Sequence, residues 1–138
     1  MEETIQAMEE IAKFLQTLPK KLKPREVQSF IQALLNTRRV FVVGAGRSGL
    51  VVRAFATRLM HLDFDVYVVG ETITPALRPG DLLVALSGSG ETDLIVESAK
   101  IAKKVGARVA ALTSYPVSYT HLRAHETRHD LVCRLLLE

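Results

Sequence analysis

Two amphipathic helices are predicted within residues 1–38. In the first of them the apolar residues recur every three or four positions, a spacing that places them on one stripe of a helix. These residues are Ile5, Met8, Ile11, Leu15 and Leu18. We expect the first helix to end at Pro19, because proline lacks the N–H that a continuing helix uses. Pro24 suits the first turn of the second helix, and Asn36 would be its exit.

From residue 40 the pattern changes to short, continuous apolar runs separated by helical stretches. Four strands are expected, at residues 40–43, 66–69, 82–86 and 108–112. Continuous runs of this kind are typical of strands that are covered on both faces. The helix expected at 93–105 would turn Ile95, Ala99 and Ala102 inward and end at Gly106. Strands that alternate with helices favour an α/β fold, a doubly wound parallel sheet with helices on both faces.

The composition is that of one globular domain. The chain has 138 residues, of which 48% are hydrophobic and 24% charged, a balance too apolar for a disordered protein. No apolar run approaches the roughly 20 residues that cross a membrane, and the acidic start is unlike a secretory signal. The single cysteine, Cys133, excludes an internal disulfide and a multi-cysteine metal site, which favours a reducing, cytoplasmic setting.

Basic residues gather in two short groups, at residues 20–25 and at Arg38 and Arg39, and the net charge is only +3. Neither group is interleaved with aromatic residues or continues as a stripe, as nucleic-acid binding would need. We interpret them as a solvated linker and the solvated start of a strand. We therefore expect no nucleic-acid partner.

A glycine-rich segment, Gly44-Ala-Gly-Arg-Ser-Gly49, follows the first expected strand. It matches the pattern G-x-G-x-x-G, which lets an anion approach backbone N–H groups at the start of a helix. Glu71, close to the end of the next strand, lies about where a dinucleotide site places its ribose partner. A nicotinamide-cofactor site is therefore one interpretation of this segment.

The second glycine-rich segment, residues 87–92, indicates a different ligand. It reads Ser-Gly-Ser-Gly-Glu-Thr and carries three hydroxyls in a turn that opens a helix. Backbone amides and hydroxyls there would form a cup for one phosphate monoester, for which a dinucleotide site has no need. An ordinary helix-capping turn is the simpler alternative, with Ser89 or Thr92 as the N-cap. The candidate phosphate-binding residues are Ser48, Ser87, Gly88, Ser89, Gly90, Glu91 and Thr92.

Two further residues are candidate substrate contacts, Arg47 in the first glycine-rich segment and His61 towards the end of the helix that follows it. Each has an alternative role. The guanidinium of Arg47 would pair equally well with a neighbouring carboxylate, and His61 would suit the carbonyl end of its helix.

The two glycine-rich segments resemble those of the sugar-isomerase (SIS) family of phosphosugar-binding domains. Residues 58–64 (RLMHLDF) and 69–75 (VGETITP) are similar to the 6-phospho-3-hexuloisomerases within that family. The resemblance covers residue 1 to about residue 116. It implies a flavodoxin-like three-layer core at 39–116, with the helices of residues 1–38 packed on it. One departure is Asp63, where the family usually has glycine, and we expect it to affect only a helix exit.

The resemblance also implies a chemistry. Such enzymes interconvert D-arabino-hex-3-ulose 6-phosphate and fructose 6-phosphate through an enediol, in the ribulose monophosphate pathway of formaldehyde assimilation, with no metal or redox cofactor. It implies that Ser48, Ser87, Gly88, Ser89 and Thr92 hold the phosphate. It further implies that the base is a glutamate beyond the fourth strand, and that the complete protein is a homodimer or homotetramer.

Two alternatives within the family stay open. One is another aldose–ketose isomerase, such as one that acts on arabinose 5-phosphate. The other is a regulator that binds a sugar phosphate without catalysis. Regulators of this kind usually carry a DNA-binding helical domain ahead of the SIS core, and residues 1–38 show no recognition-helix pattern.

Residues 117–138 differ abruptly in composition from the preceding chain. His121, His125 and His129 recur every four residues, with Cys133 next in the series, a spacing that suggests a metal site. We reject this site, because the segment resembles the translation of a transposase-type sequencing adapter and is expected to be a non-native tail. The last strand, the last helix and the catalytic glutamate would then be missing, with Glu126 no substitute. We accordingly expect a marginally folded chain without useful turnover.

Overall fold

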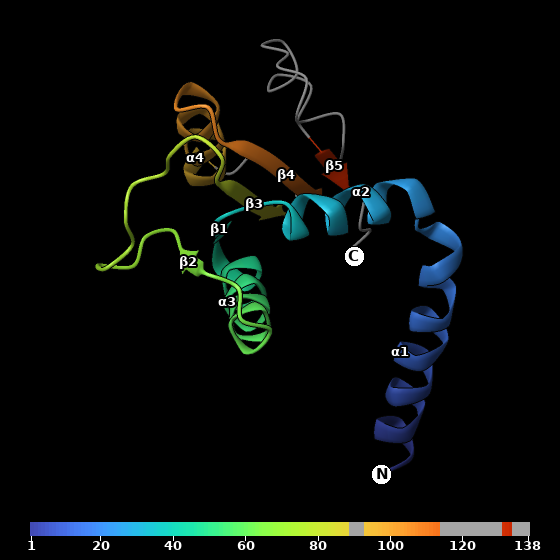
Figure 1. The fold of residues 1–138 in the computed structure, drawn as a ribbon. Coiled ribbons are helices and arrows are strands. Elements are labelled where there is room, and N and C mark those ends of the chain that lie inside the picture. Colours follow the sequence, from blue (N-terminus) through green and yellow to red (C-terminus); the bar gives the residue numbers. More distant parts are fainter. Residues whose placement is uncertain (89–92, 114–130, 134–138) are drawn as a thin grey trace.

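The computed structural model of the chain (Figure 1) describes residues 1–88, 93–113 and 131–133. In chain order the elements are α1 (Glu2–Lys21), α2 (Pro24–Leu35), β1 (Val40–Gly44), α3 (Gly46–His61), β2 (Val66–Val68), β3 (Leu82–Ser87), α4 (Asp93–Lys104), β4 (Arg108–Thr113) and β5 (Leu131–Cys133). After an N-terminal helix pair, helices follow β1 and β3, whereas β2 leads to β3 without a helix. The four strands and the helices expected between them are therefore confirmed, with ends that shift by one or two residues.

All strand pairs in the sheet are parallel, and the strand order is β2-β1-β3-β4-β5. This arrangement confirms the expected doubly wound α/β fold. The expectation that the last strand is missing is wrong at the level of the backbone, because Leu131–Cys133 pairs with Ala110–Leu112. The edge of β4 offers unpaired N–H and C=O groups, and a short apolar run can satisfy them.

Alternate residues of the central strands enter two separate cores, one on each face of the sheet. Val40 and Val42 of β1 pack with α2 and α3, whereas Phe41 and Val43 pack with α4. On the first face Phe30 of α2 stacks on Phe55 of α3, with ring centroids 6.3 Å apart. Because strand side chains alternate in direction, a run that is apolar at every position must be covered on both sides.

Two helix ends adopt the left-handed conformation. Gly106 follows α4 with φ +82°, as expected for a glycine C-cap. Asp63 follows α3 with φ +62° and is the one non-glycine residue with a positive φ in the described chain. Asp63 therefore stands at a helix exit, as expected. Glycine would adopt the same backbone conformation there without strain.

Helix α1 differs from the expectation in two respects. It continues through Pro19 to Lys21, because a proline in the last turn costs one hydrogen bond and Leu22 N–H still reaches Leu18 O at 3.1 Å. We expected both N-terminal helices to pack on the core. Ala33 and Leu34 of α2 are buried, but α1 buries no residue and leads away from the sheet (Figure 1).

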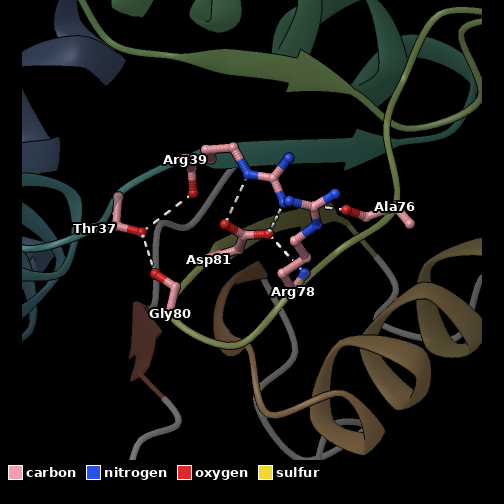
Figure 2. Close-up of polar contacts among 6 residues, drawn as sticks. All are labelled: Thr37, Arg39, Ala76, Arg78, Gly80 and Asp81. Carbon is pink, nitrogen blue, oxygen red and sulfur yellow. Dashed lines mark hydrogen bonds and ion pairs between the residues drawn. The ribbon is translucent and has the colours of Figure 1, made fainter.

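A buried ion pair joins the amino ends of β1 and β3 (Figure 2). Arg39 Nε and Nη2 donate to the two carboxylate oxygens of Asp81 at 3.0 and 2.5 Å, and Nη2 also reaches Ala76 O at 3.1 Å. The backbone N–H of Arg78 donates to the same carboxylate at 2.7 Å. This pair raises the pKa of Arg39. The expectation of a solvated strand start is wrong for Arg39, whose side chain is only 11% exposed.

The same guanidinium lies over two aromatic side chains, one on β1 and one on β2. It lies 5.1 Å from the ring centre of Phe41 and 5.9 Å from that of Tyr67, and these two rings stack on each other. The segment between β2 and β3 contains no helix. The Arg39–Asp81 pair ties this segment down at Ala76 and Arg78, so that cation–π contacts replace part of the missing cover.

Candidate phosphate site at the carboxyl edge of the sheet

The carboxyl ends of β1 and β3 lie side by side at the centre of the sheet. Gly44 at the end of β1 is in register with Leu86, one residue before the end of β3. The chain then leaves β1 into α3 on one face and runs from β3 towards α4 on the other. In a sheet of this order the crevice between two such diverging connections is where ligands bind.

The first glycine-rich segment forms the end of β1 and the first turn of α3. Gly46, Arg47, Ser48 and Gly49 are helical, and Ala45 is the N-cap without a side-chain hydrogen bond. Gly49 N–H donates to Ala45 O at 3.2 Å, whereas residues 46–48 have no acceptor within the helix for their N–H groups. These groups and the positive end of the helix dipole favour an anion at this position.

Packing within the protein accounts for two of the three glycines in this segment. A Cβ at Gly44 would lie 2.7 Å from Ser48 O, and a Cβ at Gly49 would lie 3.0 Å from Gly44 O. Gly46 has φ +54° and open space around it. Gly44 and Gly49 therefore allow α3 to begin directly against the strand end, and they carry no information on the ligand by themselves.

The second segment begins with Ser87 and Gly88 at the end of β3. Ser87 is 2% exposed, and a Cβ at Gly88 would meet open space. Ser87 is the last residue of β3, one position after the Leu86 that faces Gly44, and Gly88 follows it, so both lie beside the point where the chain leaves β1 towards α3. The other candidate residues of this segment, Ser89, Gly90, Glu91 and Thr92, lie outside the described part of the chain.

Thr113 is a residue of this edge that the sequence analysis did not consider. It is in register with Ser87 at the end of β4 and is 1% exposed. Its hydroxyl group therefore belongs to the same row of strand ends. The signal that identifies it is its place at the end of a predicted strand, which becomes informative only when the order and register of the strands are known.

Glu71 is engaged by a neighbouring helix. Its carboxylate forms an ion pair with Arg53 of α3. Thr74 holds the same turn by donating from Oγ1 to Val68 O at 2.5 Å and from its N–H to Glu71 O at 3.1 Å. A ribose bound to Glu71 would have to compete with Arg53. The geometry thus weakens the dinucleotide interpretation, in which this carboxylate must accept from the ribose hydroxyls.

Arg47 and His61 lie at opposite ends of α3. Arg47 is exposed in the first turn, next to Ser48, where it can approach an anion bound at the helix start. His61 is the last residue of this 16-residue helix, and a rise of 1.5 Å per residue separates it from Gly46 by about 22 Å along the axis. Within a single chain, His61 therefore lies far from the candidate phosphate site.

The titratable groups with displaced pKa values lie elsewhere. The Tyr67 hydroxyl donates a hydrogen bond to the Asp65 carboxylate, and this bond, together with burial, raises the pKa of Tyr67. Tyr67 is also close to the Arg39–Asp81 pair. Residues 121, 125 and 129 of the histidine series lie outside the described residues, as does the side chain of Cys133. In the part of the chain that the structure does describe, no helix is long and apolar enough to cross a membrane.

The strand order and the helix that starts at the end of β1 define a class, the doubly wound α/β proteins, in which a helix start at the central strand ends suits an anion. Within that class the chain belongs to the SIS domain family, whose family model matches residues 33–129. The expected family is confirmed. The match extends past residue 116, where the resemblance was expected to end.

The chain is also similar in sequence to individual proteins. The chain is 52% identical over 98 residues to the 3-hexulose-6-phosphate isomerase of Mycobacterium gastri, covering 71% of this chain and 49% of that protein. It is 52% identical over 115 residues to an uncharacterized protein of Aeropyrum pernix, covering 80% and 54%. The chain thus spans about half the length of these relatives.

A solved structure supports the same likeness. The crystal structure of a hypothetical protein from Methanococcus jannaschii, for which a function of 3-hexulose-6-phosphate isomerase is inferred, superposes with a TM-score of 0.73 at 35% identity. The superposition covers 83% of this chain and 61% of that one. The fold of a three-layer SIS protein is therefore established independently of the sequence patterns.

Proposed function

We propose that this protein is a sugar-phosphate isomerase that interconverts D-arabino-hex-3-ulose 6-phosphate and fructose 6-phosphate. The observation that carries the proposal is the strand register, which places the end of β1, from which α3 begins, beside the end of β3, where Ser87 and Gly88 lie. The identity of 52% to a 3-hexulose-6-phosphate isomerase supports this substrate over other sugar phosphates.

The phosphate group would occupy the gap between α3 and the end of β3. The N–H groups of residues 46–48 point along the helix axis and suit a phosphate dianion. Ser48 and Ser87 would add hydroxyl donors. Gly88 would let the ligand approach the backbone, since no atom of the described residues, its chain neighbours aside, lies within 4 Å of a Cβ placed there. Ser89, Gly90, Glu91 and Thr92 complete this proposed set, with Arg47 as an exposed cation beside it.

The reaction itself needs a proton to move between neighbouring carbons. A base removes the proton beside the carbonyl, an enediol forms, and the proton returns at the adjacent carbon, so that no electron leaves the sugar. Such a base must come within about 3 Å of the carbon-bound proton. The resemblance assigns it to a glutamate beyond the fourth strand and to no position of this sequence, and the phosphate site is therefore tested by binding.

A thermal-shift experiment with matched ligands tests the proposal. A ligand that binds only the folded chain raises the melting temperature by an amount that grows with its affinity. We expect fructose 6-phosphate to raise it and NAD to leave it unchanged. Equal stabilisation by arabinose 5-phosphate would favour another isomerase of the family, and stabilisation by NAD alone would restore the dinucleotide interpretation and overturn the proposal.

We further propose that the protein acts in the cytoplasm as a homodimer or homotetramer, without nucleic-acid or membrane partners. The exposed apolar stripe of α1 supports the oligomer. Light scattering coupled to size-exclusion chromatography tests it, with a mass of two or four chains expected. A mass of one chain at every concentration would contradict it.

We also propose that the chain divides into the N-terminal helices (1–38), the SIS core (39–116) and a non-native tail (117–138). A variant that ends at Pro116 tests whether residues 117–138 belong to the folded unit. An unchanged melting temperature would support a non-native tail. A marked fall would show instead that the pairing of β5 with β4 contributes to the stability of the domain.

A further inference from the structure

The turn of residues 70–74 borders the candidate phosphate site on the side of β2. In the sheet, β1 lies between β2 and β3, and neighbouring strands are about 4.8 Å apart. An anion at the end of β1, where α3 begins, therefore has Ser87 of β3 on one side and the end of β2 on the other. A ligand larger than phosphate can extend over the turn that follows β2.

Backbone hydrogen bonds give this turn a defined shape. Val69 N–H continues the sheet by donating to Val42 O at 2.9 Å, and Glu71 N–H donates to Val68 O at 3.3 Å. Thr74 closes the turn through its N–H and its hydroxyl, which donate to Glu71 O and Val68 O. These bonds root the turn on β1 and β2 but leave open how it sits against α3.

An ion pair ties the turn to α3. The Glu71 carboxylate pairs with Arg53, which lies seven residues after Gly46, the first residue of the helix. At a rise of 1.5 Å per residue this is about 10 Å along the axis from the helix start. The pair therefore sets the position of the turn relative to the helix whose first N–H groups suit an anion.

Stability alone is a poor account of this pair. The two side chains are 58 and 41% exposed, and an exposed ion pair contributes little to the free energy of unfolding. The turn that it holds presents Thr72 and Ile73 to solvent, and Ile73 is 90% exposed. A hydroxyl group and an apolar side chain are the groups with which a binding site contacts the hydroxyls and carbons of a sugar.

We propose that Arg53 is a positioning residue for the sugar end of the ligand. By holding Glu71 it keeps the turn of residues 70–74 where Thr72 and Ile73 contact the sugar. This inference rests on the proposed function and adds an element of selectivity to the same site. The guanidinium of Arg53 is engaged by Glu71 and lies about two helical turns from the anion position, so it acts on the sugar through the turn.

Removing either partner of the pair gives a test with opposite signs. If Arg53 attracted the ligand directly, Glu71→Gln would release its charge and strengthen the binding of every phosphate compound. If the pair positions the turn, Glu71→Gln and Arg53→Gln both weaken binding of fructose 6-phosphate, by about 3- to 5-fold for the loss of an exposed contact. Isothermal titration calorimetry measures this affinity, and we expect the affinity for inorganic phosphate to stay the same.

Two further variants serve as controls. Arg58→Gln removes the same charge from an exposed position in the last turn of α3, and it should change neither affinity. Arg53→Glu combined with Glu71→Arg forms the pair again with its charges exchanged, and it should recover the affinity for fructose 6-phosphate. The melting temperatures of all variants should agree, because the pair is exposed.

The outcomes separate this inference from the proposed function. If the wild-type chain and both single variants bind fructose 6-phosphate equally well, the phosphate site stands and the positioning role of Arg53 is wrong. Tighter binding by Glu71→Gln would also overturn it, as would an equal loss of affinity for fructose 6-phosphate and inorganic phosphate. If neither compound binds the wild-type chain, the proposed function fails and this inference fails with it.

Discussion

The two edges of the central sheet are built from different chemistry. At the amino edge, charged side chains join elements that are far apart in the chain: the buried pair of Arg39 and Asp81, and the half-buried Arg108, which donates to the carbonyls of Ala33 and Asn36 at 3.1 Å each. At the carboxyl edge, glycines and hydroxyl residues follow the strands, and the first N–H groups of α3 have no acceptor within the helix. One edge is held together by its own charged groups, and the other presents a helix start that suits an anion.

This difference leads us to expect that stability and binding are separable in this fold. The same strands pass from a closed polar network at one end to a helix start that suits an anion at the other. Substitutions at the amino edge should therefore lower the stability of the chain with little effect on the affinity of the folded molecules. Substitutions at the carboxyl edge should lower the affinity of the folded molecules with little effect on stability. The exceptions are Gly44 and Gly49, where the backbones of β1 and α3 touch.

The largest expected effect follows from removing Asp81. Asp81→Ala leaves the Arg39 guanidinium buried without its carboxylate and the Arg78 N–H without its acceptor. Breaking one side of a buried pair lowers the free energy of unfolding by about 3–5 kcal/mol. Urea denaturation measures the loss, and Glu97→Ala, in the exposed pair with Lys100, is the control with an expected loss below about 1 kcal/mol. Equal losses in Asp81→Ala and Glu97→Ala would show that the buried pair contributes no more to stability than an exposed ion pair.

Two glycines at the carboxyl edge give opposite expectations. A Cβ at Gly44 would meet the Ser48 carbonyl, so Gly44→Ala forces β1 and α3 apart and costs about 1–3 kcal/mol. Gly88 faces open space, so Gly88→Ala should keep the stability and reduce only the affinity for fructose 6-phosphate. Melting temperature and calorimetric affinity, measured on both variants, distinguish the two roles. A stability loss in Gly88→Ala that matched that of Gly44→Ala would contradict them.

Ser87 should separate binding from stability. Ser87→Ala removes the hydroxyl group at the end of β3, and one hydrogen bond to a charged phosphate is worth about 1.5–3 kcal/mol, so the affinity for fructose 6-phosphate should fall about 10-fold or more. Ser98→Ala is the matched control, since Ser98 is also buried and donates to Leu94 O at 2.7 Å on α4. Isothermal titration calorimetry measures both. An unchanged affinity in Ser87→Ala would remove this residue from the site.

The smallest effect concerns a helix exit that belongs to neither edge network. Asp63 has φ +62°, a conformation that costs a non-glycine residue about 1–2 kcal/mol and glycine almost nothing. The greater freedom of glycine in the unfolded chain offsets part of this gain. Asp63→Gly should therefore raise the free energy of unfolding by about 0.5 kcal/mol, measured by urea denaturation. A decrease would mean that the aspartate side chain stabilises this turn.

Local patterns predicted the elements that depend on local physics. The apolar runs predicted four strands, and Ile95, Ala99 and Ala102 lie on the buried face of α4 as their spacing indicates. The ends of α2 and α4 followed from Asn36 and Gly106. In each case the residues that make the structure are neighbours in the sequence, so their pattern carries the information.

The sequence patterns did not predict contacts between residues that are far apart in the chain. Arg39 and Asp81 are 42 residues apart, and each alone is typical of a solvated surface residue. Thr113 became part of the carboxyl edge only through its register with Ser87. The place of the two glycine-rich segments at one edge of the sheet was predicted more closely, because they directly follow two strands whose ends must meet in a parallel sheet. The first glycine-rich segment spans the junction itself, because Gly44 ends β1 and Gly46 begins α3.

A crystal structure of the chain with bound fructose 6-phosphate tests the central claim most directly. We predict the phosphate at the carboxyl edge, within hydrogen-bond distance of the N–H groups of residues 46–48 and of the Ser87 hydroxyl, with the sugar directed outward from the strand ends. A phosphate bound at the amino edge or elsewhere on the surface, with α3 and Ser87 unoccupied, would contradict the assignment of this edge as the binding site.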